Sequence, residues 1–338
     1  MKVLLIKTSS MGDVIHSLPA LTDAASAIPG ITFDWVVEEG FSEIPGWHPA
    51  VDKIIPVAIR RWRKSPFNTL ATGEWRRFKE RLQSREYDAV IDAQGLFKSA
   101  LLAKLAKGPA FGLDKHSARE PISAHFYKHP LNICWNQHAV ERVRQLVAKS
   151  LGYAIPRETG RFSLDQSRFD KETYSHTPYV VFIHSTTWPD KHWPEPYWCQ
   201  LANKVNDNGY KVLLPWGNTT EKERAERIAQ SSSNTEVLPK SSLSGIAGVI
   251  AGASGVVAVD TGLGHLSAAL EKPAVSLYGP TSPDRVGAYG KSQVHLTLED
   301  CPAGDFPSVE PDIFAPMTPE LVWDNLVTLL PQGRRNDT

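Results

Sequence analysis

The sequence predicts an α/β protein built from two doubly wound domains, and three observations support this prediction. Short β-branched or leucine-rich runs alternate with longer amphipathic stretches, which is the pattern of βα units in parallel sheets. One polar segment, residues 155–178, interrupts the alternation without a sustained period. The chain has 338 residues, more than one hydrophobic core usually supports. We therefore expect a first domain over residues 1–160, a linker over 161–178 and a second domain over 179–338.

The first domain begins with the apolar run Val3–Ile6, which is typical of a buried strand. Pro19 lies inside the first predicted helix and is expected to kink it or to delay its regular part, because proline has no backbone N–H. The same patterning predicts strands at residues 2–7, 31–37, 53–58 and 88–93, and helices near 14–27, 74–86, 97–107 and 138–150.

The second domain repeats this alternation. Its last helix is expected either to stay on this domain or to cross back to the first one. Open parallel sheets bind ligands at the carboxyl ends of their strands, so the loops that follow the strands are the places to look for function. Strands are predicted at 179–185, 211–217, 235–239, 255–261 and 274–279, and helices near 195–207, 220–231, 243–252, 263–271 and 319–330.

The charges are balanced in total but divided between the halves. Lys+Arg and Asp+Glu both number 37, yet residues 1–150 hold 21 basic and 15 acidic side chains, which leaves 16 and 22 for residues 151–338. A basic first half suggests that it handles an anion, although charges spread over solvated helices would give the same total.

The cysteines and the apolar runs indicate the compartment. Cys134, Cys199 and Cys301 are widely spaced and form no CxxC pair, so neither a disulfide framework nor a zinc site is indicated, and a reducing cytoplasm is expected. The N-terminal apolar run is too short for a signal-peptide core, and no other run has the length of a membrane span. Any membrane role is therefore expected at the surface of the bilayer.

The segment GVVAVDTGLGHLSAAL (255–270) carries the strongest local signal. A buried strand runs into Asp260-Thr261-Gly262 and a helix opens there, so backbone N–H groups and the positive end of the helix favour a phosphate. The alternative makes Thr261 a helix cap and His265 a packed helical histidine. Gly262-Leu-Gly264 also half-matches the GxGxxG dinucleotide fingerprint, but it follows a late strand.

Two further strand ends in this domain carry polar groups. After the strand at 179–185, Thr186 and Thr187 offer hydroxyls and Lys191 offers a point charge for a phosphate, unless the segment is simply a turn with an exposed lysine. After the strand at 211–217, Glu221 is expected to accept hydrogen bonds from ribose hydroxyls or merely to favour the start of a helix.

The segment RRWRK in the first half clusters Arg60, Arg61, Arg63 and Lys64 around one tryptophan. Arginine provides forked donors that suit carboxylate and phosphate oxygens, so the cluster suggests an anion site. An ordinary solvated charge run explains it equally well. No DxD pair, HExxH motif or other ligand spacing indicates a metal site.

Several segments in combination resemble the lipopolysaccharide heptosyltransferases of glycosyltransferase family 9. They are KTSSMGDVIHSLPALTDA (7–24), RRWRK (60–64), DAQGLFKSA (92–100), DKHWP (190–194), DTGLGH (260–265) and YGPT (278–281), and they span nearly the whole chain. The resemblance implies a GT-B fold, in which two Rossmann-like domains face a central cleft. The first domain would bind the acceptor and the second the nucleotide sugar.

The resemblance also implies a reaction, and KTSSMGD is typical of members that add the first heptose. An inverting transfer would move L-glycero-D-manno-heptose from ADP-heptose to the first Kdo of Kdo2-lipid A. The family's general base falls on Asp13, for which the alternative role is a helix N-cap. No cofactor or metal is expected, because Lys191 and the end of the helix at Thr261 would stabilise the departing diphosphate.

The remaining site residues are carried over by the same resemblance. The donor, ADP-heptose, is expected to contact Thr186, Thr187, Lys191, Glu221, Ser241, Asp260, Thr261, Gly262 and His265. The acceptor is expected to contact Ser10, Gly12, Arg60, Arg61, Arg63, Lys64, Lys98, Arg119 and His138. One departure from the family pattern is Trp188-Pro189, which follows the threonine pair where relatives often have polar residues.

The resemblance further implies a cytoplasmic protein, peripheral on the cytoplasmic face of the inner membrane, with RRWRK as one candidate for contact with the anionic surface. Nucleic acid is not an expected partner. Two alternatives remain open: a second heptosyltransferase or another family 9 transferase, and a dinucleotide-binding oxidoreductase. The oxidoreductase is disfavoured because no glycine fingerprint follows the first strand.

Overall fold

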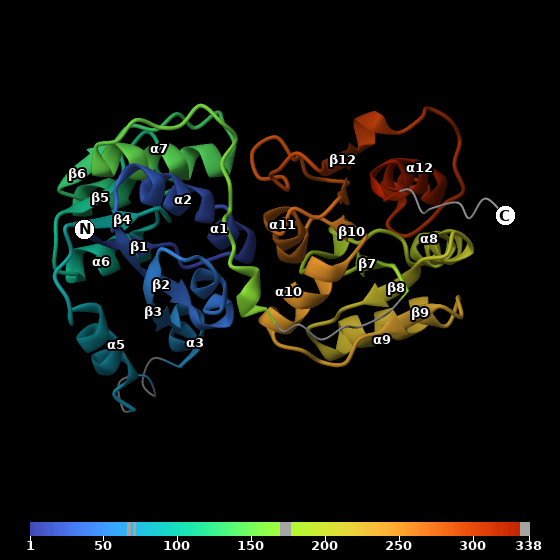
Figure 1. The fold of residues 1–338 in the computed structure, drawn as a ribbon, viewed down its shortest axis with the longest axis horizontal. Coiled ribbons are helices and arrows are strands. Elements are labelled where there is room, and N and C mark those ends of the chain that lie inside the picture. The colour runs from blue at the N-terminus through green and yellow to red at the C-terminus, as the bar shows by residue number, and fades with distance from the viewer. Residues whose placement is uncertain (66–68, 70–71, 170–176, 332–338) are drawn as a thin grey trace. The chain divides into compact units, whose positions relative to one another are not determined.

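The computed structural model describes residues 1–65, 69, 72–169 and 177–331. The chain divides into two compact units, residues 1–165 and 166–338 (Figure 1). The division falls within the segment predicted as a linker, of which residues 170–176 lie outside the described residues. Among the helices of the described residues, none is long and apolar enough to cross a membrane.

The described part of the first unit contains a six-stranded parallel sheet in the order β3-β2-β1-β4-β5-β6. This order reverses direction at β1 and β4, as in a doubly wound fold. The strands are β1 (Lys2–Ile6), β2 (Thr32–Glu38), β3 (Val51–Val57), β4 (Ala89–Asp92), β5 (Ala110–Leu113) and β6 (His129–Leu131). The α-helices are α1 (Met11–Ile15), α2 (Leu18–Ala27), α3 (Ile59–Lys64), α5 (Glu74–Leu82), α6 (Phe97–Leu105) and α7 (Ala139–Leu151).

The described part of the second unit repeats the design with the sheet order β12-β11-β10-β7-β8-β9. Its last helix, α12, packs on α8 and against β11 of the same unit. The strands are β7 (Tyr179–Ile183), β8 (Lys211–Leu214), β9 (Thr235–Val237), β10 (Gly255–Val259), β11 (Ala274–Tyr278) and β12 (Gln293–Thr297). The α-helices are α8 (Glu195–Asp207), α9 (Thr219–Ala229), α10 (Leu243–Gly252), α11 (Gly262–Ala269) and α12 (Pro319–Leu329).

The sequence prediction was wrong about the first helix. It begins at Met11, before the predicted position 14, and is broken at His16 and Ser17 into α1 and α2. Pro19 lies in the first turn of α2, where the missing N–H costs nothing because the first N–H groups of a helix have no intrahelical partner. Proline therefore delays the regular helix instead of kinking it.

Three strands were also missed: β5, β6 and β12. β6 has three residues and includes Pro130, which is tolerated because β6 is the last strand at its edge of the sheet. β12 lies at an edge of the other sheet. Short edge strands carry little periodicity of their own, so their pairing depends on a neighbour supplied by the fold. The prediction of an α/β protein with two doubly wound sheets is nevertheless confirmed.

A buried ion pair holds α7 to α2 in the first unit. The Arg144 guanidinium is almost fully buried and donates to Asp23 on α2, with 2.6 Å between Nε and Oδ2. It also donates to both carboxylate oxygens of Glu141. A buried guanidinium needs such partners, because an unpaired buried charge would strongly destabilise the fold.

Candidate active site

The carboxyl end of β1 places Asp13 in the first turn of α1. Ser10 is the N-cap of this helix, and its N–H and Oγ–H both donate to Asp13 Oδ2 at 2.9 Å. The other carboxylate oxygen lies 3.2 Å from the Lys7 ammonium. The alternative role as N-cap is therefore wrong in its position, because Ser10 occupies the cap and Asp13 closes a capping box.

These contacts determine the charge of Asp13. Burial would raise the pKa of this carboxyl, but the Lys7 ammonium, the two hydrogen bonds from Ser10 and the nearby His16 lower the pKa to about 2. The side chain remains 39% exposed. Asp13 is thus an ionised carboxylate at neutral pH that a ligand can reach.

The loop between β1 and α1, which leads to Asp13, is tied to the loop after β4 by the Gln94 side chain. Its Oε1 accepts from the backbone N–H groups of Thr8 and Ser9, at 2.9 and 3.1 Å, and from the Thr8 hydroxyl. Lys7 Nζ adds a hydrogen bond to the Ala93 carbonyl at 3.1 Å. Gln94 and Lys7 were missed as site residues, although both lie in segments already singled out by the resemblance.

Asp92 fixes the start of the same loop from within the sheet. Its carboxylate is fully buried and accepts from the N–H groups of Gln94 and Gly95 and from the Tyr127 hydroxyl at 2.8 Å. Burial raises the pKa of Asp92, and these hydrogen bonds oppose the rise. We assign Asp92 a structural role, because it orients the loop and does not reach the surface.

The RRWRK segment forms α3, directly after β3. The Arg61 guanidinium is held between Glu39 and Glu74, with N–O distances of 2.9 to 3.1 Å, so its donors already have partners. Trp62 is half-buried beside Trp75 and donates to Glu74 Oε2. The other three basic side chains of the cluster, Arg60, Arg63 and Lys64, are exposed.

The other expected acceptor residues follow neighbouring strands. Lys98 lies in the first turn of α6, after β4, and Arg119 lies in the loop after β5. The two loops are joined through Glu120, whose N–H donates to the Gly95 carbonyl and whose carboxylate accepts from the Phe97 N–H at 2.7 Å.

His138 is the N-cap of α7 and accepts from the Val140 N–H. Its ring lies 5.2 Å from that of His16, the C-cap of α1, so it is close to the helix that carries Ser10, Gly12 and Asp13. Since all these residues follow parallel strands, they share the carboxyl edge of one sheet.

In the second unit, Asp260 joins the loops after three strands. Its Oδ2 lies 2.5 Å from Lys191 Nζ and accepts from the Thr281 hydroxyl at 3.0 Å. The Thr186 hydroxyl donates to the Asp260 carbonyl at 3.1 Å. Lys191 is therefore a fixed cation beside the opening of α11.

The first turn of α11 follows directly. Thr261 is its N-cap in extended backbone conformation, and its side chain makes no capping hydrogen bond. Gly264 lets the helix approach β10 closely, because a Cβ there would meet the Ala258 Cβ at 3.3 Å. His265 is buried within the helix, as the alternative interpretation expected, while Gly262 begins the helix.

The lysine loop carries the unusual Trp188-Pro189 pair. Pro189 opens a short 3₁₀ turn, η5 (Pro189–Lys191), and the Trp188 side chain is exposed. Lys191 Nζ lies 5.8 Å from the centre of the Trp188 ring. Thr187, the second residue of the threonine pair, is also exposed.

The two remaining residues expected to contact ADP-heptose follow β8 and β9. Glu221, in the first turn of α9, accepts from the Gly217 N–H and from the Asn218 side chain, both at 2.7 Å. Ser241 precedes α10 and donates to the Pro239 carbonyl at 3.2 Å. Along the order β10-β7-β8-β9, the expected donor residues thus follow four adjacent strands. Within the described residues, no three His, Cys, Asp or Glu side chains are grouped as metal ligands.

A residue that sequence reasoning missed holds the Lys191 loop in place. Arg224 on α9 donates from Nη1 to His192 Nδ1 at 2.8 Å and from Nη2 to the Trp193 carbonyl at 2.6 Å. Arginine is always a donor, so His192 must carry its proton on Nε2, which donates to the Thr186 carbonyl at 2.8 Å. Burial lowers the pKa of His192, which keeps the ring neutral.

Comparison with known proteins gives consistent matches. Residues 75–310 match the model of glycosyltransferase family 9 (heptosyltransferase). Lipopolysaccharide heptosyltransferase 1 of Pseudomonas aeruginosa is 58% identical over 308 residues, which cover 91% of this chain and 85% of that protein.

Two solved structures of E. coli heptosyltransferase WaaC are similar to this chain over nearly its whole length. The structure with ADP has a TM-score of 0.88 and 50% identity, and the structure with ADP-2-deoxy-2-fluoro heptose has a TM-score of 0.85 and 49% identity. Both matches cover 96% of this chain and 98% of the other. The predicted GT-B fold class is confirmed by this likeness together with the two six-stranded sheets.

Proposed function

The chain belongs to glycosyltransferase family 9, the heptosyltransferases, and from this membership we propose that it transfers heptose from ADP-heptose in the synthesis of the lipopolysaccharide core. The relatives named above support the donor, because one was solved with ADP and with a fluorinated ADP-heptose. Family membership excludes the dinucleotide oxidoreductase, since the chain is a glycosyltransferase.

We propose further that the acceptor is the first Kdo of Kdo2-lipid A and that the transfer inverts the anomeric centre. A Kdo hydroxyl oxygen attacks the anomeric carbon, the bond from that carbon to the phosphate oxygen breaks, and ADP leaves with the electron pair. The hydroxyl proton passes to the Asp13 carboxylate. The observation that carries this mechanism is the ionised and accessible carboxylate of Asp13 at the carboxyl end of β1.

A carboxylate whose pKa is about 2 is a weak base toward a free alcohol. The attacking oxygen becomes far more acidic as it gains positive charge during bond formation, so the proton is transferred late in the attack. Lys7 favours the ionised form of Asp13, and Ser10 orients the carboxylate. Asp13 therefore needs to be well positioned more than it needs to be strongly basic.

On the donor side, we propose that Lys191 and the first turn of α11 stabilise the diphosphate as it leaves, without a metal ion. The ammonium supplies the charge, and the first N–H groups of an eight-residue helix supply donors. Asp260 keeps the ammonium in place, and Thr281 orients Asp260.

The proposed activity is tested with purified protein, ADP-heptose and Kdo2-lipid A in the presence of EDTA. We expect release of ADP and a product with the anomeric configuration inverted, as read by NMR. Transfer only to an acceptor that already carries one heptose would identify a second heptosyltransferase instead. Loss of turnover in EDTA with recovery by Mg²⁺ would contradict metal independence.

Arg224 is expected to act as a positioning residue for the donor. In Arg224→Met, His192 loses the hydrogen bond that fixes its tautomer, so the Thr186–Lys191 loop loosens. A hydrogen bond to a charged group is worth about 1.5–3 kcal/mol, so KM for ADP-heptose should rise about 10- to 100-fold while kcat changes less. Steady-state kinetics with varied donor measures both constants.

Arg227→Met is the matched control for Arg224→Met. Arg227 lies on the same helix, but its guanidinium is half-exposed and pairs with Glu195 at the surface. Its KM for the donor should stay close to the wild-type value, because a surface ion pair contributes little. If both substitutions raised the KM for ADP-heptose equally, the effect would come from the stability of α9 and not from the contact of Arg224 with His192.

We propose that the protein works in the cytoplasm, peripherally at the inner face of the inner membrane. The support is chemical: the acyl chains of the proposed acceptor lie in a bilayer, while its Kdo sugars project from the surface. A soluble enzyme that acts on such an acceptor must approach the lipid surface.

A further inference from the structure

Three large apolar side chains are exposed on two elements of the first unit that pack against each other, α6 and η3. Phe97 is 42% exposed and Leu101 39% exposed, one turn apart on α6. Ile122 is 56% exposed on η3 (Pro121–Phe126), a 3₁₀ segment that packs along α6. We call these three residues the α6–η3 patch. Single exposed apolar residues are ordinary, but a group of them marks an interaction site.

The way α6 is built explains the exposure. Its buried face consists of Ser99, Ala100, Leu102 and Ala103, which pack toward the sheet. Phe97 and Leu101 lie on the outer face together with the exposed Lys104, at positions where a surface helix normally carries polar residues.

η3 is also held firmly, so the patch is presented by a fixed backbone. Glu120, just before η3, binds the Phe97 N–H, and Tyr127, just after it, binds Asp92. The Phe97 ring meets the Phe126 ring edge to face at 5.5 Å.

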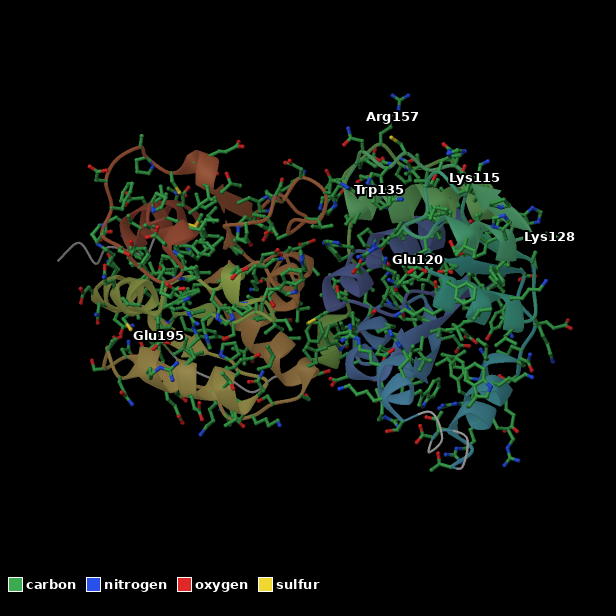
Figure 2. All side chains as sticks on the ribbon, turned by 180° about the vertical axis from the view of Figure 1, so that it is seen from behind. Lys115, Glu120, Lys128, Trp135, Arg157 and Glu195 are labelled. Carbon is green, nitrogen blue, oxygen red and sulfur yellow. The ribbon has the colours of Figure 1, made fainter. Side chains whose placement is uncertain are left out.

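The segment of chain that carries the patch is basic. Residues 97–129 contain five lysines and one arginine but only two acidic residues, Asp114 and Glu120. Asp114 accepts from Ser117 and Asn132, and Glu120 accepts from Phe97. Figure 2 shows Lys115 and Lys128 toward the right-hand edge of the first unit, with Glu120 nearer its centre. Lys104, Lys107, Lys115, Arg119 and Lys128 are exposed.

We propose that the α6–η3 patch docks the protein on a bilayer that contains anionic phospholipids. The three apolar side chains would enter the headgroup region, and the exposed lysines of the same segment would face lipid phosphates. Apolar groups together with basic side chains are the combination that binds such surfaces. A partner protein is less suited, because the apolar group is small and the charges around it are mostly of one sign.

The position of the patch fits the proposed reaction, on which this inference rests. Lys98 and Arg119 are both expected acceptor contacts. Lys98 directly follows Phe97, and Arg119 directly precedes Glu120, which binds the Phe97 N–H and the Gly95 carbonyl. A membrane docked there would bring Kdo sugars to the sheet edge that carries Asp13. The RRWRK helix is less suited to this role, since Arg61 is already paired and Trp62 packs inward.

The test is co-sedimentation of the full chain with vesicles of phosphatidylcholine alone or mixed with phosphatidylglycerol. The wild type should bind the mixed vesicles, and binding should weaken as salt is raised. The double variant Leu101→Ser/Ile122→Ser should bind at least about tenfold more weakly, because two apolar side chains no longer leave water. Wild-type protein that ignores mixed vesicles, or a double variant that binds them equally well, would overturn the proposal.

Val327→Ser is the matched control, since Val327 is 44% exposed on α12 of the second unit. It should sediment like the wild type. If the double variant proves unstable by thermal melting, Lys104→Glu/Lys128→Glu tests the same surface through its charge and should also weaken binding. If the patch instead bound a second copy of this chain, the wild type would be dimeric and would not sediment with vesicles, which would contradict the proposal.

Activity separates this inference from the proposed function. The double variant should keep wild-type kcat/KM on a deacylated, water-soluble Kdo acceptor and lose about tenfold on Kdo2-lipid A embedded in mixed vesicles. A wild type that binds vesicles but transfers no heptose to either acceptor would refute the proposed function and leave the docking surface intact.

Discussion

Replacing Asp13 with asparagine is expected to lower kcat for heptose transfer by about 10²- to 10⁴-fold, the usual contribution of a general base. Asparagine has nearly the same shape and can still accept the hydrogen bond from the Ser10 N–H. It cannot take a proton at neutral pH. The rate of ADP release under saturating substrates measures the effect, and the thermal midpoint shows whether the fold survives.

The control for this substitution is Ser17→Ala. Ser17 Oγ donates to the Asp13 carbonyl, so its loss disturbs the same short helix without touching the carboxylate. We expect kcat within about fivefold of the wild type, since the net contribution of one hydrogen bond is about 1 kcal/mol. If Asp13→Asn keeps wild-type turnover, the carboxylate is only a capping residue.

The lowered pKa of Asp13 predicts how the stability of the fold and the rate of heptose transfer depend on pH. The ordinary value is 3.8 and the folded value is about 2, so the ionised carboxylate stabilises the fold above pH 3.8, and this stability is lost as pH falls through about 2. An acid limb of kcat/KM above pH 4 therefore does not report Asp13 in the wild type. In Lys7→Met the ammonium is gone, so the pKa of Asp13 should rise. The loss of kcat/KM that reports protonation of Asp13 should then occur at a higher pH than in the wild type, as a pH profile of kcat/KM would measure.

Replacing Lys191 with methionine is expected to have an effect of similar size, about 10²- to 10³-fold on kcat/KM for ADP-heptose. The substitution removes the cation proposed for the diphosphate. It also leaves the Asp260 carboxylate unpaired beside the opening of α11, where it would repel an anion. Steady-state kinetics with varied ADP-heptose measures the loss.

Two variants separate these effects of Lys191. In Lys191→Met/Asp260→Asn the repelling carboxylate is also neutralised, so the double variant should be more active than Lys191→Met alone, and the difference measures the coupling. Lys222→Met is the matched control, because this half-exposed lysine pairs with Glu226 on the surface of α9. Rescue of Lys191→Met by added Mg²⁺ would assign the charge stabilisation to a metal ion instead.

Strongly patterned elements were predicted well from the sequence. The helices α8 and α10 occupy the predicted ranges 195–207 and 243–252, because their apolar periodicity is a property of the segment itself. The break between α1 and α2 and the short edge strands β6 and β12 were not predicted. Their formation depends on contacts with neighbouring elements, which a local pattern does not contain.

The candidate site was also predicted only in part, because local patterns do not contain the contacts between distant segments. Motifs placed Asp13, Lys191 and Asp260 after the ends of strands, where parallel sheets bind ligands. Gln94 and Arg224 were missed because their importance lies in their partners. Gln94 reaches Thr8, 86 positions away in the chain, and Arg224 reaches His192, 32 positions away. Neither contact leaves a periodic or composition signal in the sequence.

The opening segment KTSSMGD illustrates this division. The sequence predicted that a strand ends here and a helix follows, because the apolar run stops at Ile6. It offered Asp13 as the cap and placed the helix near residue 14, whereas Ser10 is the cap in the folded chain. Whether Asp13 would be charged, accessible and fixed depended on the folded chain. The partners Lys7 and Ser10 are near neighbours in the chain, but the burial of the carboxylate, its distance to the ammonium and the support of the segment by Gln94 are set only when the chain folds.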